Sequence, residues 1–305
     1  MKDPIQKYFK IGVLEFMAYP ASDKGRHHGL LETIKKIAYD NYFGAIELAP
    51  IEDKRLRQDV AKVLSEAHMS VCFCTQPALL ATKYNTCDTD EEGRKKAETL
   101  LLEAVDEAEQ LGAKGVAFLA GKWSVETKEQ NYSQLLKTAG NVCAYAKTKG
   151  MMVELEVFDF DFEKSSLIGP APYAAAFAAD VRRNFDNFGL IVDLSHIPLT
   201  YETPEYVIKT LAPYTTHLHL GNAVCLDKNA EGYGDQHPRF GFPNSANGVD
   251  EVLEFLQTAK SEGLMDPVNP LVMSFEVKPR AYEDPDAVVA GAKRVLDRAW
   301  ALLSD

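Results

Sequence analysis

The chain has 305 residues, of which 46% are hydrophobic and 26% are charged. These fractions are those of a globular protein and exclude the disordered and fibrous classes, while the length suits either two ordinary domains or one (β/α)₈ barrel. With 45 acidic and 33 basic residues the net charge is −12, which repels phosphate backbones and anionic lipids, so we expect neither nucleic acid nor a membrane as a partner.

The sequence also predicts a cellular compartment. No apolar run reaches the roughly 18 residues that a membrane span needs, and the opening residues lack the charged and apolar regions of a secretory signal. The cysteines are odd in number and form no C-x-x-C pair, which indicates reduced thiols. We therefore expect a soluble, cytoplasmic protein whose thiols are all free: Cys72, Cys74, Cys87, Cys143 and Cys225.

Short apolar or β-branched runs alternate with longer amphipathic stretches along the whole chain, and the two periodicities predict strands and helices respectively. We expect strands at 11–17, 45–50, 70–77, 115–121, 151–159, 190–197, 216–223 and 271–279. We expect the helices that follow them at about 30–38, 56–67, 90–111, 128–147, 172–184, 204–211, 249–262 and 286–303.

Eight strand–helix units in one chain of this length favour a parallel sheet closed into a single (β/α)₈ TIM barrel domain that spans 1–305. The phosphate-binding glycine motifs of open sheets do not occur in the sequence. The irregular stretch at about 222–248 is long for a loop, and we expect it to extend over the active-site mouth. Glycines mark four helix-to-strand junctions, where a helix end favours a positive φ: Gly44, Gly112, Gly150 and Gly189.

In such barrels the reactive groups stand at the C-terminal ends of the strands. The fifth to the eighth predicted strands each place one oxygen or imidazole ligand near the exit: Glu156, Asp193, His219 and Glu276. Three carboxylates and one histidine, without a thiolate, suit a divalent cation that prefers oxygen. We expect Mn²⁺ first, with Mg²⁺, Co²⁺ or Zn²⁺ as alternatives, in a site that keeps positions open for the oxygens of a substrate.

These motifs resemble those of the xylose isomerase-like barrels, especially the ketose 3-epimerases and related sugar isomerases. The resemblance covers the chain from the first strand to the last helix and rests on four motifs in order: Leu155-Glu156-Val157, Asp193 to His196, His217 to His219 and Phe275-Glu276-Val277. It implies that the four strand-end residues bind one metal ion.

The resemblance further implies proton transfer next to a carbonyl. An ion that holds the carbonyl oxygen and a neighbouring hydroxyl stabilises an enediolate, and Glu156 and Glu276 would then exchange the proton on opposite faces of the carbon. This predicts an isomerase or epimerase that acts on a sugar or a cyclic polyol. The alternative for both carboxylates is a pairing with Lys or Arg in the barrel interior.

Candidate substrate-binding residues surround this centre, each with a structural alternative. His196 would hydrogen-bond a substrate hydroxyl or else the backbone. Lys278 would bind a substrate oxygen or merely neutralise the carboxylates. Asp235 and His237, in the long irregular stretch, would belong to a lid or wall over the site or to a surface excursion.

Further groups near strand exits are less specific. Glu47 would bind substrate hydroxyls or form a salt bridge, and Trp123 would stack on a sugar ring or fill the core. For His217 and Glu154 we expect an interior, hydrogen-bonded role rather than direct ligation. For the histidine pair at 27–28 we expect solvated surface rather than the mouth of the barrel.

Two positions depart from the ketose 3-epimerase pattern. Cys225 stands where an Arg helps to bind the terminal oxygens of the substrate, and Phe162 stands where a Glu contacts the substrate. Because the metal and proton-transfer groups remain, the resemblance implies the same chemistry with a different specificity pocket.

Three other functions compete with isomerisation. The nearest is a lyase that dehydrates a keto-inositol or cleaves a 3-oxo-glycoside, because the same enediolate can expel a group from the next carbon. An endonuclease IV-like AP endonuclease is disfavoured by the net charge and by the lack of histidines at the third and fourth strand exits. A non-catalytic sugar-binding subunit is disfavoured by the complete set of four ligands. Barrels of this type often pair, so a homo-oligomer is our prior expectation.

Overall fold

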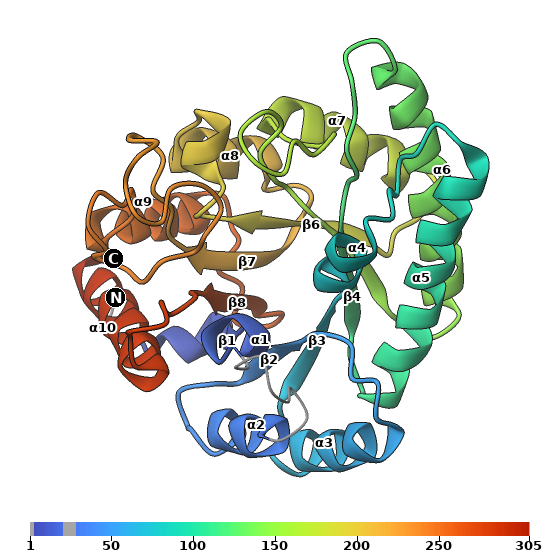
Figure 1. The fold of residues 1–305 in the computed structure, drawn as a ribbon. Helices are drawn as coiled ribbons and strands as arrows, with labels where there is room; N and C mark the ends of the chain where they lie inside the picture. Colours follow the sequence, from blue (N-terminus) through green and yellow to red (C-terminus); the bar gives the residue numbers. More distant parts are fainter. Residues whose placement is uncertain (1–2, 21–28, 305) are drawn as a thin grey trace.

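One parallel sheet forms the centre of the molecule. The computed structural model describes residues 3–20 and 29–304, and within them the strands follow the order β1-β8-β7-β6-β5-β4-β3-β2. A parallel bridge between Leu14 and Glu47 joins the two end strands, which closes the sheet into a barrel (Figure 1). The strands are β1 (Phe9–Val13), β2 (Ala45–Leu48), β3 (Ser70–Cys74), β4 (Gly115–Leu119), β5 (Met152–Glu156), β6 (Phe188–Asp193), β7 (Thr215–Gly221) and β8 (Leu271–Glu276).

Helices connect successive strands and form an outer ring (Figure 1), so the chain is a single (β/α)₈ TIM barrel, as the sequence predicts. Several begin at a side chain that accepts a hydrogen bond from the first turn, at Asp53, Asp90, Thr203 and Asp284. None of the described helices is long and apolar enough to cross a membrane. The helices are α1 (Glu15–Ala18), α2 (Leu30–Ala38), α3 (Lys54–Glu66), α4 (Gln76–Thr82), α5 (Glu91–Gln110), α6 (Lys128–Lys147), α7 (Ala171–Arg182), α8 (Pro204–Leu211), α9 (Val249–Ser261) and α10 (Pro285–Leu302).

Every strand ends before its predicted bound, and two of them are followed almost directly by a short helix. The apolar run at 11–17 predicts one strand, but β1 stops at Val13 and the short helix α1 follows, because hydrophobicity alone does not separate a strand from a buried helix. The third strand stops at Cys74, and α4 begins at Gln76 with Pro77 in its first turn. Proline is tolerated there because the first turn of a helix lacks hydrogen-bond acceptors for its N–H groups.

The junction glycines serve different purposes. Gly112 and Gly150 have φ of +74° and +67°, as predicted for helix ends. The same prediction is wrong for Gly44 and Gly189, which do not adopt a positive φ. Gly189 lies inside β6, where a Cβ would collide with the side chain of Thr216. Glycine is therefore needed here because it has no side chain, and not because of its backbone conformation.

The alternation of side chains along the strands separates an apolar layer from a polar interior. In β5, Val153 and Leu155 are fully buried in the hydrophobic core, while Glu154 and Glu156 between them are buried with polar partners. In β7 the same alternation places leucines in the core and histidines at 217 and 219 in the interior. Since successive residues of a strand point to opposite faces, ionisable side chains of β5 and β7 line the interior of the barrel.

The thiols agree with the sequence prediction. All five cysteines are free, and Cys225 is half-buried whereas the other four are buried.

Candidate metal and active site

The four predicted ligands converge at the C-terminal ends of β5 to β8. Glu156, Asp193, His219 and Glu276 are all buried, and one ligand atom from each lies within 4.8 Å of the others. Neighbouring strands bring them together, since Asp193 pairs with His219 and Gly221 pairs with Glu276 in the sheet register. His219 Nδ1 lies 3.1 Å from Glu156 Oε1 and 2.8 Å from Glu276 Oε2.

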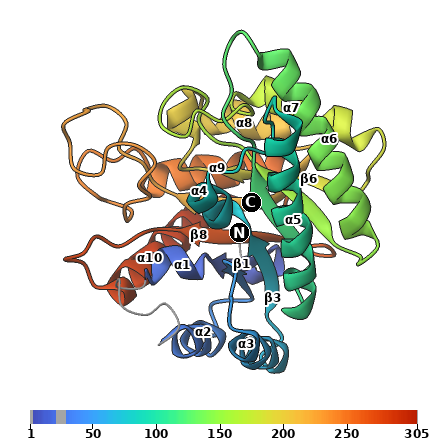
Figure 2. The same cartoon turned by 45° about the vertical axis from the view of Figure 1, so that its right-hand side comes forward.

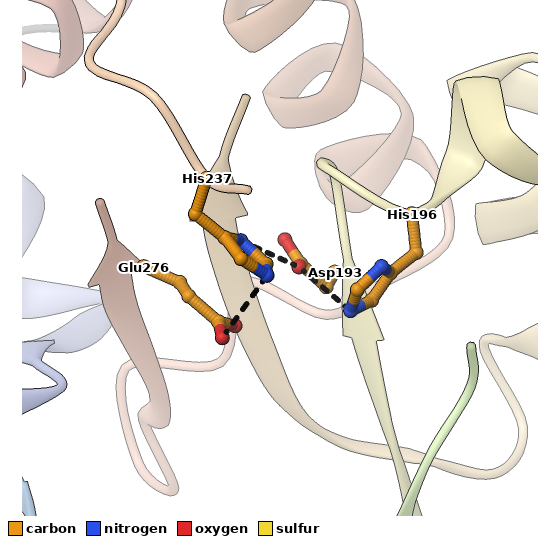
Figure 3. Close-up of side chains that lie close together, drawn as sticks. All are labelled: Asp193, His196, His237 and Glu276. Atoms are coloured by element: carbon orange, nitrogen blue, oxygen red, sulfur yellow. Dashed lines mark ion pairs between the residues drawn. The ribbon is translucent and has the colours of Figure 1, made fainter. Parts of the chain in front are cut away.

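A second group of side chains flanks this centre (Figure 3). His196 follows β6 and directs Nε2 to within 3.3 Å of Asp193 Oδ2, while its ring packs 4.3 Å from that of Phe158. His237 comes from the long loop after β7, and its Nε2 lies 3.5 Å from Glu276 Oε1. One ligand atom each from Asp193, His196, His237 and Glu276 also lies within 4.8 Å of the others.

The loop at 222–248 is anchored rather than free. The Gly234 N–H donates to the Val224 carbonyl, and the Ala246 N–H donates to the Ala223 carbonyl. The Lys278 N–H donates to the His237 carbonyl at 2.6 Å. His237 itself adopts a φ of +45°, an uncommon conformation for a residue other than glycine. The loop therefore forms a wall that carries His237 and Asp235 into the site.

Negative charge dominates the interior. Buried carboxylates occur at Glu47, Glu154, Glu156, Asp193, Asp235 and Glu276. Within the described part of the chain, the one lysine or arginine paired with any of them is Lys164, whose Nζ lies 2.6 Å from Asp235 Oδ2. Histidines also contact these carboxylates, but the buried acidic groups outnumber the basic groups around them, so the barrel mouth is suited to binding a cation.

The carboxylates shift the pKa values of the histidines upward. Burial lowers the pKa of His196, but Asp235 and Asp193 outweigh burial and raise it to about 10. The pKa of His237 is raised to about 9, because Glu276 and Asp235 outweigh the effect of burial. Among the acids, burial and the neighbouring Glu156 raise the pKa of Glu276, whereas His196 and His219 lower the pKa of Glu156 despite its burial. Two carboxylates with pKa values shifted apart are typical of an acid–base pair.

The donor atoms fit a metal ion better than a closed hydrogen-bond network. Glu276 Oε2, Asp235 Oδ1 and both ring nitrogens of His196 are buried without a hydrogen-bond partner among the described residues. Glu276 Oε2 nevertheless lies 2.8 Å from His219 Nδ1, so the two atoms are close but not aligned for a hydrogen bond. Buried ligand atoms that lie close together and lack a hydrogen-bond partner are expected around a divalent cation.

Glu47 contacts the ring nitrogen of His219 that faces away from Glu156 and Glu276. Its carboxylate is fully buried, with Oε1 2.9 Å from His217 Nε2 and 3.1 Å from His219 Nε2. Cys74 Sγ donates to Oε2 at 3.2 Å. These contacts are those of the salt-bridge alternative for Glu47. His217 and Glu154 have the interior role that the sequence predicts, with His217 Nδ1 3.5 Å from Glu154 Oε2.

Two predicted substrate-binding residues lie apart from these groups. The side chain of Lys278 is exposed, and among the described residues no ion pair joins it to the carboxylates, so the structure shows no contact for the neutralising alternative. Trp123 is half-buried and packs against the hydrophobic core, with Lys128 Nζ 5.4 Å from its ring centroid, which agrees with the core alternative. The histidine pair at 27–28 lies outside the described residues.

Three polar residues of the site were not predicted. Gln76, at the start of α4, donates from Nε2 to Glu156 Oε2 at 2.7 Å. Ser195 donates to Asp193 and lies 3.2 Å from His237 Nδ1. Gln76 and Ser195 follow strand ends, so the rule that identified the ligands would also have found them. Lys164 lies in the loop after β5, where no spacing in the sequence points to the site.

Comparisons with known proteins agree with this arrangement. Xylose isomerase-like TIM barrels, as a family, match residues 30–268, and the chain belongs to that family. No curated protein matches the chain in sequence.

Solved structures of sugar epimerases share the fold. An L-ribulose 3-epimerase superposes with a TM-score of 0.71 at 18% identity, with 96% of each chain covered. The D-psicose 3-epimerase of Clostridium cellulolyticum H10, solved with D-tagatose, gives a TM-score of 0.70 at 15% identity, with 97% of this chain and 100% of that chain covered. A 3-keto-D-glucoside 4-epimerase from E. coli gives a TM-score of 0.64 at 14% identity, with 94% of this chain and 98% of that chain covered.

Proposed function

We propose that the protein is a divalent-metal-dependent isomerase or epimerase of a sugar or cyclic polyol. The observation that carries this proposal is the convergence of Glu156, Asp193, His219 and Glu276, with ligand atoms within 4.8 Å of one another. The sugar epimerases that share the fold support the substrate class. Three carboxylates and one imidazole favour Mn²⁺, Mg²⁺ or Co²⁺ over a thiolate-preferring ion.

The proposed reaction moves one proton between two faces of a carbon. A divalent ion held by the four residues would stabilise the negative charge that develops on the carbonyl oxygen and the neighbouring hydroxyl. Glu276 or Glu156 takes the proton from the carbon next to the carbonyl, which leaves an enediolate. The other carboxylate then gives a proton to the opposite face of that carbon. An oxygen of each carboxylate lies within 4.8 Å of the other, so both carboxylates serve the same part of the barrel mouth.

The flanking groups would orient the substrate. His196 and His237 lie on opposite sides of Asp193 (Figure 3). His196 Nε2 is 3.7 Å from Glu156 Oε1, and His237 Nε2 is 3.5 Å from Glu276 Oε1. Their ring nitrogens can donate to hydroxyl groups, and Asp235 Oδ1 lies 2.6 Å from His237 Nε2. Oriented hydroxyls would fix which carbon loses its proton.

Hydrogen exchange tests the proposal directly. The protein, loaded with Mn²⁺, is incubated in D₂O with a panel of ketoses, inososes and oxo-glycosides, and NMR records deuterium on the carbon next to the carbonyl. We expect deuterium in an intact sugar and in its epimer or isomer, and no exchange once the metal is removed with EDTA. A released aglycone or a dehydrated product would instead support the lyase. Absence of exchange in every substrate would refute both.

A pair of matched variants tests whether Glu276 takes part in proton transfer. Glu276→Gln keeps the size of a residue that we place in proton transfer. Glu107→Gln alters a carboxylate of α5 that pairs with Arg57, outside the ligand groups. We expect the first variant to lose exchange and the second to keep it.

A further inference from the structure

Gln76 is the first residue of α4 and lies two residues beyond the C-terminal end of β3. Figures 1 and 2 show α4 nearer to the centre of the barrel than the outer helix α5. The preceding residue is fixed to β4, because the N–H and the hydroxyl of Thr75 both donate to the Ala117 carbonyl, at 2.9 and 2.6 Å. The start of α4 therefore holds the Gln76 side chain at the rim where the proposed metal ligands gather.

The side-chain amide of Gln76 has one paired end and one unpaired end. Gln76 is 7% exposed, and its Nε2 donates to Glu156 Oε2 at 2.7 Å. Glu156 is ionised, because His196 and His219 lower its pKa, and an ionised carboxylate only accepts hydrogen bonds. The NH₂ group must therefore face Glu156. Oε1 occupies the other end of the amide, where it is buried without a hydrogen-bond partner among the described residues.

The neighbouring interior side chains offer no free donor to this oxygen. Cys74, Ala117 and Ile191 form a small apolar cluster with the half-buried Phe16, and Ala117 pairs with Cys74 in the sheet register. The Cys74 thiol already donates to a carboxylate. Nearly all buried polar atoms in proteins have a hydrogen-bond partner, and an unpaired acceptor is unfavourable. A bound molecule that donates to Gln76 Oε1 would remove this penalty.

Oε1 lies within reach of a substrate at the Glu156 carboxylate. The C–O and C–N bonds of an amide measure about 1.23 and 1.33 Å, so Oε1 is at most about 2.6 Å from Nε2. Since Nε2 lies 2.7 Å from Glu156 Oε2, Oε1 is at most about 5.3 Å from that carboxylate oxygen. A reacting carbon lies about 3–3.5 Å from the group that attacks it, and an O–H···O hydrogen bond spans about 2.5–3.0 Å. A hydroxyl on the reacting carbon or on its neighbour can therefore meet Oε1.

We propose that Gln76 is a specificity-determining residue whose Oε1 accepts a hydrogen bond from a substrate hydroxyl close to the carbon that loses its proton. This inference rests on the proposed function and specifies a group that the substrate must carry. The two ends of the amide then have separate effects. Nε2 positions Glu156 and so affects every substrate equally, whereas Oε1 favours only substrates that present the hydroxyl.

Deuterium exchange with deoxy analogues tests the inference. The probes are the member of the substrate panel that exchanges fastest and its analogues that lack one hydroxyl near the carbonyl, each with Mn²⁺-loaded protein. In the wild type we expect kcat/KM for one analogue to be about tenfold or more below that of the parent sugar. In Gln76→Met, which keeps the length of the side chain but has no amide oxygen, the two values should agree within about threefold. Gln130→Met, which alters an exposed glutamine of α6, should keep the wild-type preference.

The preference for the parent sugar separates contact from structural damage, because damage or a displaced Glu156 slows the parent and the analogue alike. Gln76→Glu keeps an oxygen acceptor and should retain the preference, although its charge lies beside Glu156. Circular dichroism checks that each variant is folded, and Gln76→Ala replaces Gln76→Met if the latter is not.

The outcomes distinguish this inference from the proposed function. An unchanged preference in the folded Gln76→Met or Gln76→Ala protein, as expected if Oε1 binds only a water molecule, would overturn the inference and leave the proposed function intact. Equal kcat/KM for the parent and all analogues in the wild type would have the same meaning. Absence of exchange with every member of the panel would refute the proposed function and the inference with it.

Discussion

Replacement of Glu47 by Gln is expected to weaken metal binding although Glu47 is not itself a ligand. Its carboxylate lies 3.1 and 3.3 Å from His219 Nε2, while Nδ1 of the same ring faces Glu156 and Glu276. A carboxylate that accepts from Nε2–H fixes the tautomer whose Nδ1 lone pair is free for an ion. Loss of such a partner typically lowers metal affinity by about 10–100-fold, or about 1.4–2.8 kcal/mol.

The assay is a titration of metal-free protein with Mn²⁺, followed by calorimetry, for the wild type, Glu47→Gln and Glu107→Gln. Circular dichroism checks that each variant is folded. We expect an affinity loss in the first variant alone. A folded Glu47→Gln protein that binds Mn²⁺ within about threefold of the wild type would refute the assignment of Glu47 as the residue that orients His219.

Three further predictions concern stability, pH and turnover. Arg94→Ala should lower the free energy of unfolding by about 3–5 kcal/mol in urea titrations, because the 1% exposed Arg94 pairs with Glu91 and Glu98 and donates to Thr138; a loss below about 1 kcal/mol would contradict this. In metal-free protein the pKa of His217 is about 9 instead of 6.5, because Glu47 outweighs burial. Its contribution to stability is therefore complete below pH 6.5 and is lost as the pH rises through 9. Urea unfolding in EDTA should show this decline, with a shallower slope in His217→Gln; an increase in stability over the same interval would refute it. Glu276→Gln should slow hydrogen exchange into substrate by about 10²–10⁴-fold, and an unchanged rate would exclude Glu276 from proton transfer.

The sequence predicts the barrel and its ligand set because both depend on local periodicity and strand order. The residues at 156, 193 and 276 each end a strand and His219 lies two residues before the end of β7, and consecutive parallel strands place their ends at one rim. The sequence does not predict which of these side chains meet across the barrel. Glu47 is the next-to-last residue of β2 and contacts two histidines instead of facing solvent. Such contacts depend on the stagger between strands, which the spacing of residues along the chain does not encode.

The sequence predicts contacts between loop residues less well, because such contacts also form only in the folded chain. Asp235 and His237 were identified as candidates, yet Lys164, which pairs with Asp235, was not. Their loops meet only in the folded chain, where Glu163 Oε2 accepts from the Asp235 N–H at 2.7 Å. The exposed position of Lys278 reflects the end of β8 at Glu276, after which strand parity no longer determines where a side chain points.

The junction between β1 and β2 has a consequence for how the barrel opens. It is joined by the Leu14–Glu47 bridge and by a hydrogen bond from Gly44 to Ile11, whereas each of the other junctions has at least three paired positions. Backbone with few cross-strand bonds exchanges its amide hydrogens with solvent earliest. Glu47 lies at this junction. Each transient opening between β1 and β2 would therefore free His219 from Glu47, and the rate of this opening would limit the rate at which the protein releases a bound metal ion.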